Sequence, residues 1–287
     1  MITTSPEIIL NNGIRMPALG LGVYRSSPEE TRSAVLMALQ KGYRLIDTAA
    51  AYGNEREVGE ALRRSGLHRG EVFVTTKLWV TDYGYRNALR AFEQSRRRLR
   101  LDYVDLYLLH WPVASDLAAT VASYRAAETL LAEGRVRAIG VSNHAPEQLA
   151  HLMARTKIVP SVNQVELHPF FVQRDVRAFD ARHGIVTQSW SPIGGVDRYA
   201  AESPRAARNL LAHPVIRDLA QRHGKTPAQV VLRWHLEHGL AVIPKSVHAA
   251  RIAENFEVFD FTLTPQEVAA LDALDTGVRG GPDPHWL

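Results

Sequence analysis

Four polar or ionisable side chains stand at the ends of short apolar runs or just after them: Asp47, Tyr52, Lys77 and His110. The runs are YRLIDTAAAY, VFVTTK and DYVDLYLLH, and each has the length and composition of a buried parallel strand. The converging ends of parallel strands are where α/β barrels and open α/β sheets place their chemistry. We therefore expect these four side chains to meet in one site.

A phenol beside an ammonium group is suited to passing a proton to a carbonyl oxygen. The reference pKa of Tyr is about 10, and a nearby Lys cation favours the phenolate. Lys77 could supply that charge to Tyr52, and Asp47 could hold the ammonium in place. His110 could orient the carbonyl. Singly, each residue also has a structural interpretation as a cap, a strand-end charge or a packing residue, but together they indicate reduction of a carbonyl by hydride.

Strand and helix patterns alternate along almost the whole chain. Candidate strands lie near residues 19–23, 43–47, 71–77, 104–110, 136–143, 160–166, 185–190 and 240–246. About eight such β-α units predict a (β/α)8 TIM barrel with extra helices over the barrel, in a single domain spanning residues 1–287. The longest interval, from Trp190 to Lys245, leaves room for an extra helix and a loop over the barrel mouth.

Local signals support this assignment. Asn12-Gly13 predicts the turn of an N-terminal β-hairpin. Ser27 followed by Pro28 predicts the start of a helix that Gly42 ends. A doubly wound Rossmann fold is the alternative, but GLGVYR has Arg25 where its third glycine belongs, so the fingerprint is absent.

Composition narrows the classes of function. The net charge is +4, the pI is near 9.4 and there is no Cys, which excludes disulfides and thiolate chemistry. The densest basic run (Arg96, Arg97, Arg98 and Arg100) is interpreted as a solvated helix end rather than a polyanion site. We find no signal peptide, no membrane span, no metal-ligand spacing and no nucleic-acid pattern, and expect a cytoplasmic monomer.

The chain resembles the aldo-keto reductases, and most closely the bacterial branch that includes the 2,5-diketo-D-gluconate reductases. The resemblance runs from IILNNGIRMPALGLGVY to VFDFTLTPQEVAALDALD through GYRLIDTAAAYGNEREVGEAL, VDLYLLHWP, GVSN, NQVELHP and IPKS. It implies an NADPH-dependent barrel enzyme that reduces carbonyl compounds. Tyr52 matches the proton donor of the family, Lys77 and Asp47 match the pair that tunes it, and His110 matches the residue that orients the carbonyl.

The resemblance also implies the coenzyme contacts. Three residues match groups that bind the nicotinamide carboxamide, namely Ser142, Asn143 and Gln164, and Trp190 matches the ring that stacks on the nicotinamide. Lys245, Ser246 and Arg251 match the site of the adenosine 2′-phosphate, which favours NADPH because cations suit a dianionic phosphate. His248 replaces an Arg common in this branch, so the phosphate is expected to be held slightly less firmly. The remaining expected contacts are Gly22, Val23, Ser191, Val247, Glu254 and Asn255, the last two with the adenine.

Aromatic residues near the strand ends are expected to line the substrate pocket: Tyr24, Trp79 and Trp111, together with Val23. Because the segment after Trp111 and the tail GVRGGPDPHWL are short, we expect an open pocket and a broad substrate range, including small aldehydes, dicarbonyls and keto sugars. Two alternatives stay open. One is a Schiff-base aldolase that uses Lys77, and the other is a non-catalytic NADPH-binding regulatory protein.

Overall fold

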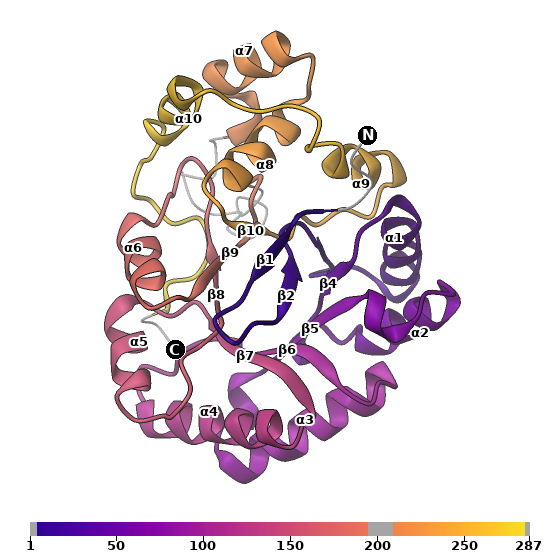
Figure 1. Ribbon diagram of the computed structural model, residues 1–287, viewed down its shortest axis with the longest axis vertical. Coiled ribbons are helices and arrows are strands. Elements are labelled where there is room, and N and C mark those ends of the chain that lie inside the picture. Colours follow the sequence, from indigo (N-terminus) through magenta and orange to yellow (C-terminus); the bar gives the residue numbers. More distant parts are fainter. Residues whose placement is uncertain (1–4, 195–208, 285–287) are drawn as a thin grey trace.

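Eight parallel strands form the centre of the molecule (Figure 1). The computed structural model describes residues 5–194 and 209–284. In spatial order the strands are β3 (Leu21–Gly22), β4 (Leu45–Asp47), β5 (Phe73–Leu78), β6 (Val104–Leu109), β7 (Val136–Ser142), β8 (Val162–Glu166), β9 (Val186–Trp190) and β10 (Ala241–Val242). The backbone N–H of Gly20 donates to the carbonyl of Val242 at 2.8 Å, and that of Val242 donates to Ala18 at 2.7 Å. These bonds bring the two end strands together and close the barrel.

Helices surround the strands, and each strand is followed by at least one of them. Those of the ring are α1 (Pro28–Lys41), α2 (Glu55–Arg64), α3 (Tyr85–Leu99), α4 (Leu117–Ala132), α5 (Pro146–Met153), α6 (Arg174–Arg182), α8 (Pro227–Glu237) and α9 (Ala249–Phe256). Two more, α7 (Pro214–His223) and α10 (Pro265–Asp272), contact α8 and each other and lie outside it in Figure 1. The predicted (β/α)8 barrel with additional helices is confirmed, and the Rossmann alternative was wrong.

The start and end of α1 follow the predicted local signals. The Ser27 side chain accepts a hydrogen bond from the backbone N–H of Glu30, whose carboxylate accepts one from the N–H of Ser27. This reciprocal pair satisfies two donors that a helix start would otherwise leave unpaired. Gly42 ends the helix with a φ of 108°, in the region that favours glycine.

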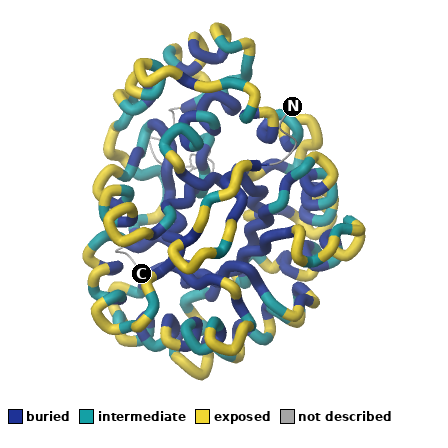
Figure 2. Tube along the Cα trace, viewed as in Figure 1, coloured by how far each residue is buried: buried dark blue, intermediate teal, exposed yellow. Residues whose placement is uncertain are grey.

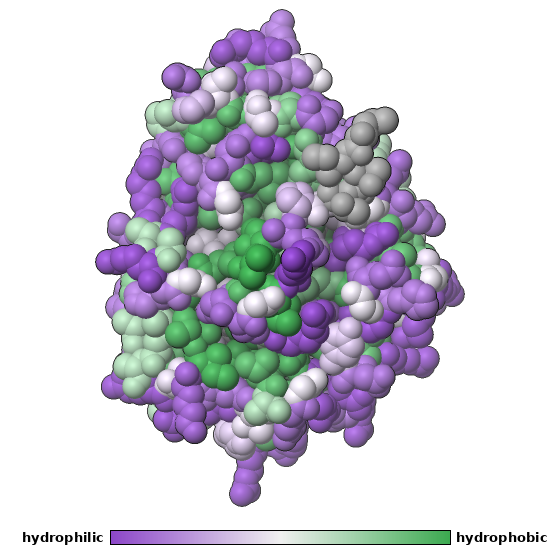
Figure 3. Space-filling view, viewed as in Figure 1, coloured by the Kyte–Doolittle hydropathy of each residue, from purple (hydrophilic) through white to green (hydrophobic). Residues whose placement is uncertain are grey.

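An antiparallel hairpin, β1 (Glu7–Ile9) with β2 (Arg15–Pro17), covers the end of the barrel seen in Figure 1. Leu10 and Met16 are buried in one apolar cluster with inward-facing barrel residues such as Leu45 and Phe73. Figure 2 shows the buried strands at the centre and the exposed residues around them, and in Figure 3 hydrophobic residues gather in the middle of this face. The hairpin therefore closes the N-terminal end, which leaves the C-terminal ends of the strands for the site.

Two further sequence features have structural explanations. Gly20 permits a close approach, because a Cβ atom there would lie 2.4 Å from the Leu45 side chain inside the barrel. The basic run forms the last turn of α3, as predicted, where Arg96 and Arg97 pair with Glu93 and Arg98 pairs with the buried Glu55.

Gly140 in β7 gives a test of how tightly the barrel wall is packed. A Cβ atom at this position would lie 2.4 Å from the backbone oxygen of Val162 and 2.9 Å from the Leu108 side chain. We expect Gly140→Ala to lower the free energy of unfolding by about 1–3 kcal/mol, the usual cost of overpacking. Gly70→Ala is the matched control, because no atom lies within 4 Å of its Cβ position. Denaturant unfolding of both variants would check this, and equal stabilities would contradict it.

Candidate active site

The structure brings Asp47, Tyr52, Lys77 and His110 together at the C-terminal ends of neighbouring strands. Asp47 ends β4, Lys77 lies in β5, and His110 directly follows β6. The Nζ atom of Lys77 donates to Oδ1 of Asp47 at 2.5 Å, to the backbone oxygen of Thr48 at 3.1 Å and to the Tyr52 hydroxyl at 3.3 Å. The three donor hydrogens of the ammonium group are thus all used, and one of them reaches the phenol.

Burial sets the electrostatics of the ion pair. The Lys77 and Asp47 side chains are 0% and 2% exposed. Burial lowers the pKa of Lys77, and the charge of Asp47 opposes this shift. Burial raises the pKa of Asp47, and Lys77 and a hydrogen bond from Gln164 oppose it. Each charge is therefore stabilised mainly by its partner, and the ammonium directs a positive field at the Tyr52 hydroxyl.

His110 lies beside the phenol as a neutral ring. Its ring centroid is 5.5 Å from that of Tyr52 and 5.1 Å from that of Trp79, in edge-on geometry. Burial holds the pKa of His110 well below its usual value, and the charge of Lys77 adds to the effect. A neutral imidazole can donate one hydrogen bond to a carbonyl oxygen without competing for the proton of Tyr52.

A short turn after β4 presents Tyr52. The residue ends a one-turn 3-10 helix, η1 (Ala50–Tyr52), which Gly53 terminates with a φ of 70°. Asn54 secures this turn: its side chain accepts from the Thr48 hydroxyl at 2.8 Å and donates to the backbone oxygen of Val23 at 2.9 Å. The predicted coenzyme residue Val23 is therefore tied to the loop that carries the phenol.

The four residues predicted to contact the nicotinamide form one connected group: Ser142, Asn143, Gln164 and Trp190. Trp190 Nε1 donates to Oδ1 of Asn143 at 2.8 Å, and Asn143 Nδ2 donates to the backbone oxygen of His110 at 2.9 Å. The Ser142 hydroxyl donates to the backbone oxygen of Gln164 at 2.7 Å. Asn143 has a φ of 63°, so its backbone is held in the left-handed region. The indole is thus linked through Asn143 to the strand end that carries His110.

Gln164 has a second role that sequence reasoning missed. Its Nε2 atom donates to Oδ2 of Asp47 at 2.8 Å and to Oε1 of Gln188 at 2.8 Å. Both amide hydrogens are therefore used inside the barrel, and among the described residues no hydrogen bond reaches its Oε1 atom. Gln164 therefore orients Asp47 through one amide hydrogen, while its Oε1 atom stays available as an acceptor.

The residues predicted to hold the adenosine phosphate cluster around the start of α9. Lys245 and Arg251 are exposed and form no ion pair with any described residue. The Ser246 hydroxyl accepts from the backbone N–H of His248, the residue before α9. A helix start flanked by two unpaired cations suits an anionic group.

The other predicted coenzyme residues lie on both sides of this helix start. Glu254 already accepts a hydrogen bond from the Thr226 hydroxyl at 2.7 Å through one carboxylate oxygen, and Asn255 is buried. The backbone N–H of Gly22 donates to Pro244 at 3.1 Å, so β3 and the strand end before Lys245 are adjacent. Ser191 and Val247 are half-buried. A loop over the mouth is expected between Trp190 and Lys245, and residues 195–208 of that interval lie outside the described residues.

The predicted pocket aromatics differ in their relation to the tetrad. Tyr24 is 42% exposed, and its ring lies 4.9 Å from that of Tyr52. Trp79 contacts His110, as described above. Trp111 is 9% exposed and makes no ring contact with the tetrad within the described part of the chain. Two of the three therefore stand beside the reacting groups.

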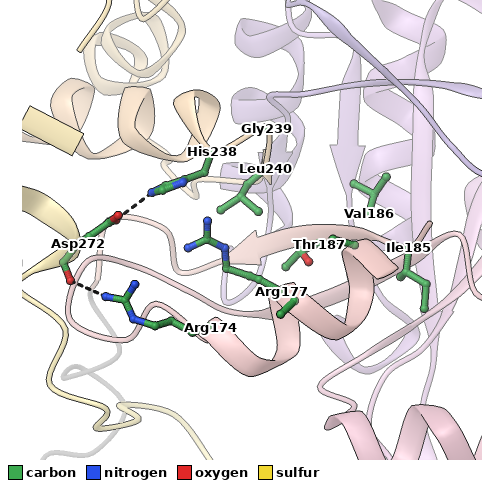
Figure 4. Close-up of a pocket in the computed structure, with 11 residues that line it drawn as sticks. Arg174, Arg177, Ile185, Val186, Thr187, His238, Gly239, Leu240 and Asp272 are labelled. Carbon is green, nitrogen blue, oxygen red and sulfur yellow. Dashed lines mark hydrogen bonds and ion pairs between the residues drawn. The ribbon is translucent and has the colours of Figure 1, made fainter. Parts of the chain in front are cut away.

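A cavity of about 540 Å³ lies elsewhere, at the N-terminal ends of β9 and β10 (Figure 4). Arg177, Ile185 and Leu240 are among its lining residues, and Asp272 accepts a hydrogen bond from His238 there at 2.9 Å. None of the predicted site residues lines it. Because the tetrad stands at the opposite ends of the strands, this cavity is not the candidate active site.

No group of three or more His, Asp or Glu side chains in residues 5–194 and 209–284 is arranged to hold a metal ion. In the same part of the chain, no helix is both long and apolar enough to cross a membrane.

A (β/α)8 barrel with these four side chains at the C-terminal ends of its strands is typical of one class of oxidoreductases. The family of this chain follows from its sequence similarity to known proteins. The model of the Aldo/keto reductase family matches residues 17–276, so the chain belongs to this family. The resemblance stated from the sequence motifs is confirmed.

Individual relatives are similar to this chain over nearly its whole length. Morphine 6-dehydrogenase of Pseudomonas putida is 55% identical over 99% of this chain and 96% of that protein. Methylglyoxal reductase DkgA of Escherichia coli K12 is 46% identical over 98% of each. A mutant of the protein Gox0644, crystallised in complex with NADPH, is 43% identical, has a TM-score of 0.90 and covers 99% of this chain and 98% of its own.

The neutral state of His110 can be tested by titration. We expect its imidazole in the folded protein to stay neutral when the pH falls through about 6.5, where an unperturbed His takes up a proton. The unfolded chain binds that proton and the folded chain does not, so this group makes the fold less stable as the pH falls below about 6.5. Ring ¹⁵N shifts, assigned with His110→Asn and compared with denatured protein, would show this. An imidazolium signal near neutral pH would contradict it.

Proposed function

We propose that the protein reduces aldehydes and ketones to alcohols with NADPH. Hydride adds to the carbonyl carbon, and Tyr52 gives its hydroxyl proton to the carbonyl oxygen. The observation that carries the proposal is the 3.3 Å contact between the Tyr52 hydroxyl and Lys77, whose ammonium is held by Asp47 at 2.5 Å. The ammonium stabilises the phenolate that remains after the transfer, and bulk solvent reprotonates it for the next turnover.

The residues at the site fit NADPH, which supplies the hydride when it is bound. The free Oε1 atom of Gln164 can accept from the nicotinamide carboxamide, and the indole of Trp190 offers a flat face for the ring. Lys245 and Arg251 would pair with the 2′-phosphate. The NADPH complex of Gox0644, at 43% identity, supports the same coenzyme here.

The proposed substrates are small aldehydes, dicarbonyls and keto sugars. The names of the relatives support carbonyl and alcohol substrates of different sizes, since one is a methylglyoxal reductase and another a morphine dehydrogenase. We further propose that residues 1–287 act as a single domain, as a cytoplasmic monomer without nucleic acid or membrane partners. Gel filtration with light scattering would test the monomer.

The two alternatives are less consistent with the site. A Schiff-base aldolase needs a Lys nitrogen with a free lone pair, but Lys77 uses all its donor hydrogens on Asp47, Thr48 and Tyr52. Borohydride trapping with substrate would reveal such an adduct. A regulatory NADPH-binding protein has no need for a buried ion pair aimed at a phenol. NADPH binding without carbonyl-dependent turnover would favour it.

Tyr52→Phe tests the proton donor. We expect turnover of NADPH with an aldehyde to fall by about 10²-fold or more, because the phenyl ring keeps the shape and loses the acid. NADPH binding, measured by fluorescence, should change little. Tyr85→Phe is the matched control, since Tyr85 on α3 is 42% exposed and its hydroxyl lies 3.0 Å from that of Thr129 on α4. Near-normal turnover in Tyr52→Phe would rule out the mechanism.

Arg251→Ala tests the phosphate site. We expect the Kd of NADPH to rise by about 10–100-fold, the worth of a charge-assisted hydrogen bond, and the Kd of NADH to change by less than about threefold. Arg86→Ala is the control, because Arg86 is exposed and unpaired among the described residues but lies on α3. Equal losses for both coenzymes would refute the assignment.

A further inference from the structure

The carboxylate of Glu166 holds the C-terminal tail at the barrel mouth. Glu166 ends β8 and its side chain is 0% exposed. Its Oε1 atom accepts from the backbone N–H of Gly280 at 2.8 Å, and its Oε2 atom accepts from that of Gly281 at 2.9 Å. His168 Nε2 lies 3.1 Å from Oε1. Two successive amides thus bind the two oxygens of one buried carboxylate, which is a charge-assisted, two-point contact.

The same tail residue packs against the predicted nicotinamide platform. A Cβ atom at Gly281 would lie 2.6 Å from Cη2 of Trp190 and 3.0 Å from Oε2 of Glu166. The backbone of the tail therefore touches the six-membered ring of the indole, while Nε1 at the other end of the indole donates to Asn143. Only glycine allows this approach, and sequence reasoning gave Gly281 no role.

Among the described residues, other contacts attach the tail on the N-terminal side of this point. Thr276 bonds to the backbone oxygen of Phe170 through its N–H at 3.0 Å and its hydroxyl at 2.8 Å. The Arg279 guanidinium lies 4.9 Å from the centre of the Phe171 ring. Residues 277–282 include three glycines and one proline, and none of the six is fully buried, whereas Pro284 is buried. Apolar packing therefore contributes little at residues 277–282, and the backbone N–H groups of Gly280 and Gly281 are held by the two hydrogen bonds to Glu166.

We propose that Glu166 is a positioning residue that sets substrate specificity by fixing the tail as a wall of the carbonyl site beside Trp190. The inference rests on the proposed function, because it assigns the carbonyl substrate to the space in front of Tyr52 and Trp190. With the tail tied down, a small aldehyde is confined next to the tetrad. With the tail released, the same aldehyde is held less firmly. A larger carbonyl compound, which makes more contacts elsewhere in the site, loses a smaller part of its binding.

Glu166→Gln is the first test. The carboxamide keeps the size of the side chain but turns one acceptor into a donor that faces a backbone N–H. We expect the KM for propanal to rise by about 5–10-fold and the KM for benzaldehyde to rise less, since loss of the charge-assisted contact releases the tail. The Kd of NADPH should stay within about twofold. Equal increases in KM for both aldehydes would overturn the proposal.

Gly280→Pro tests the same contact by changing the tail instead of the carboxylate. Proline removes the N–H that reaches Oε1 and leaves Glu166 intact, whereas the control Gly280→Ala keeps the N–H. We expect Gly280→Pro to reproduce the KM changes of Glu166→Gln. The KM values of the double variant should be no higher than those of either single variant. A normal KM in Gly280→Pro, or full additivity in the double variant, would mean that Glu166 acts by its charge on the reacting groups, and would overturn the proposal.

Amide hydrogen exchange separates this proposal from the reaction itself. In the full-length protein without coenzyme or substrate, we expect the peptide containing Gly280 and Gly281 to be protected, and to lose protection in Glu166→Gln. Retained protection would overturn the proposed tie. If carbonyl-dependent NADPH oxidation is absent in the wild type while the protection behaves as expected, the proposed function fails and the attachment of the tail to Glu166 stands.

Discussion

The ion pair between Lys77 and Asp47 is the interaction on which the rest of the site depends. Both charges are buried in the barrel wall, and an uncompensated charge in such a place costs several kcal/mol. The pair is stable because its remaining hydrogen-bonding capacity is also satisfied, by Thr48 for the ammonium and by Gln164 for the carboxylate. The third donor of the ammonium, beside those used on Asp47 and Thr48, is directed by the fold at Tyr52. The tuning of the phenol is therefore a consequence of how the pair is satisfied.

The barrel makes this arrangement possible because its two ends are chemically different. At the N-terminal end the hairpin contributes Leu10 and Met16 to an apolar interior. Toward the C-terminal end, inward-facing positions become polar, with Gln164 bonded to both Gln188 and Asp47. Apolar side chains fill the N-terminal end, and the Lys77–Asp47 pair lies toward the C-terminal end. That is where the strands deliver the tetrad.

The rim of the barrel adds a second polar system that supports the first. Asn143 joins the Trp190 indole to the backbone of His110, so the proposed coenzyme platform and the imidazole proposed to orient the carbonyl are positioned together. On the far side of the indole, Glu166 ties down the tail. In the proposed function, Trp190 contacts both the coenzyme and the tail that borders the substrate, which links the specificity of the site to the position of the tail.

The sequence by itself determined the features that depend on neighbours in the chain. Side-chain periodicity located the eight strands, Ser27 and Gly42 delimited α1, and the rule that parallel strands deliver chemistry at their C-terminal ends selected the tetrad. Only the tertiary structure decided which polar groups satisfy one another. Gln164 and Asp47 are 117 positions apart, and Gly280 and Glu166 are 114 apart. Such partners are fixed by barrel closure, since a buried carboxylate must bond to whichever donors the closed fold places within about 3 Å, and no local pattern encodes them.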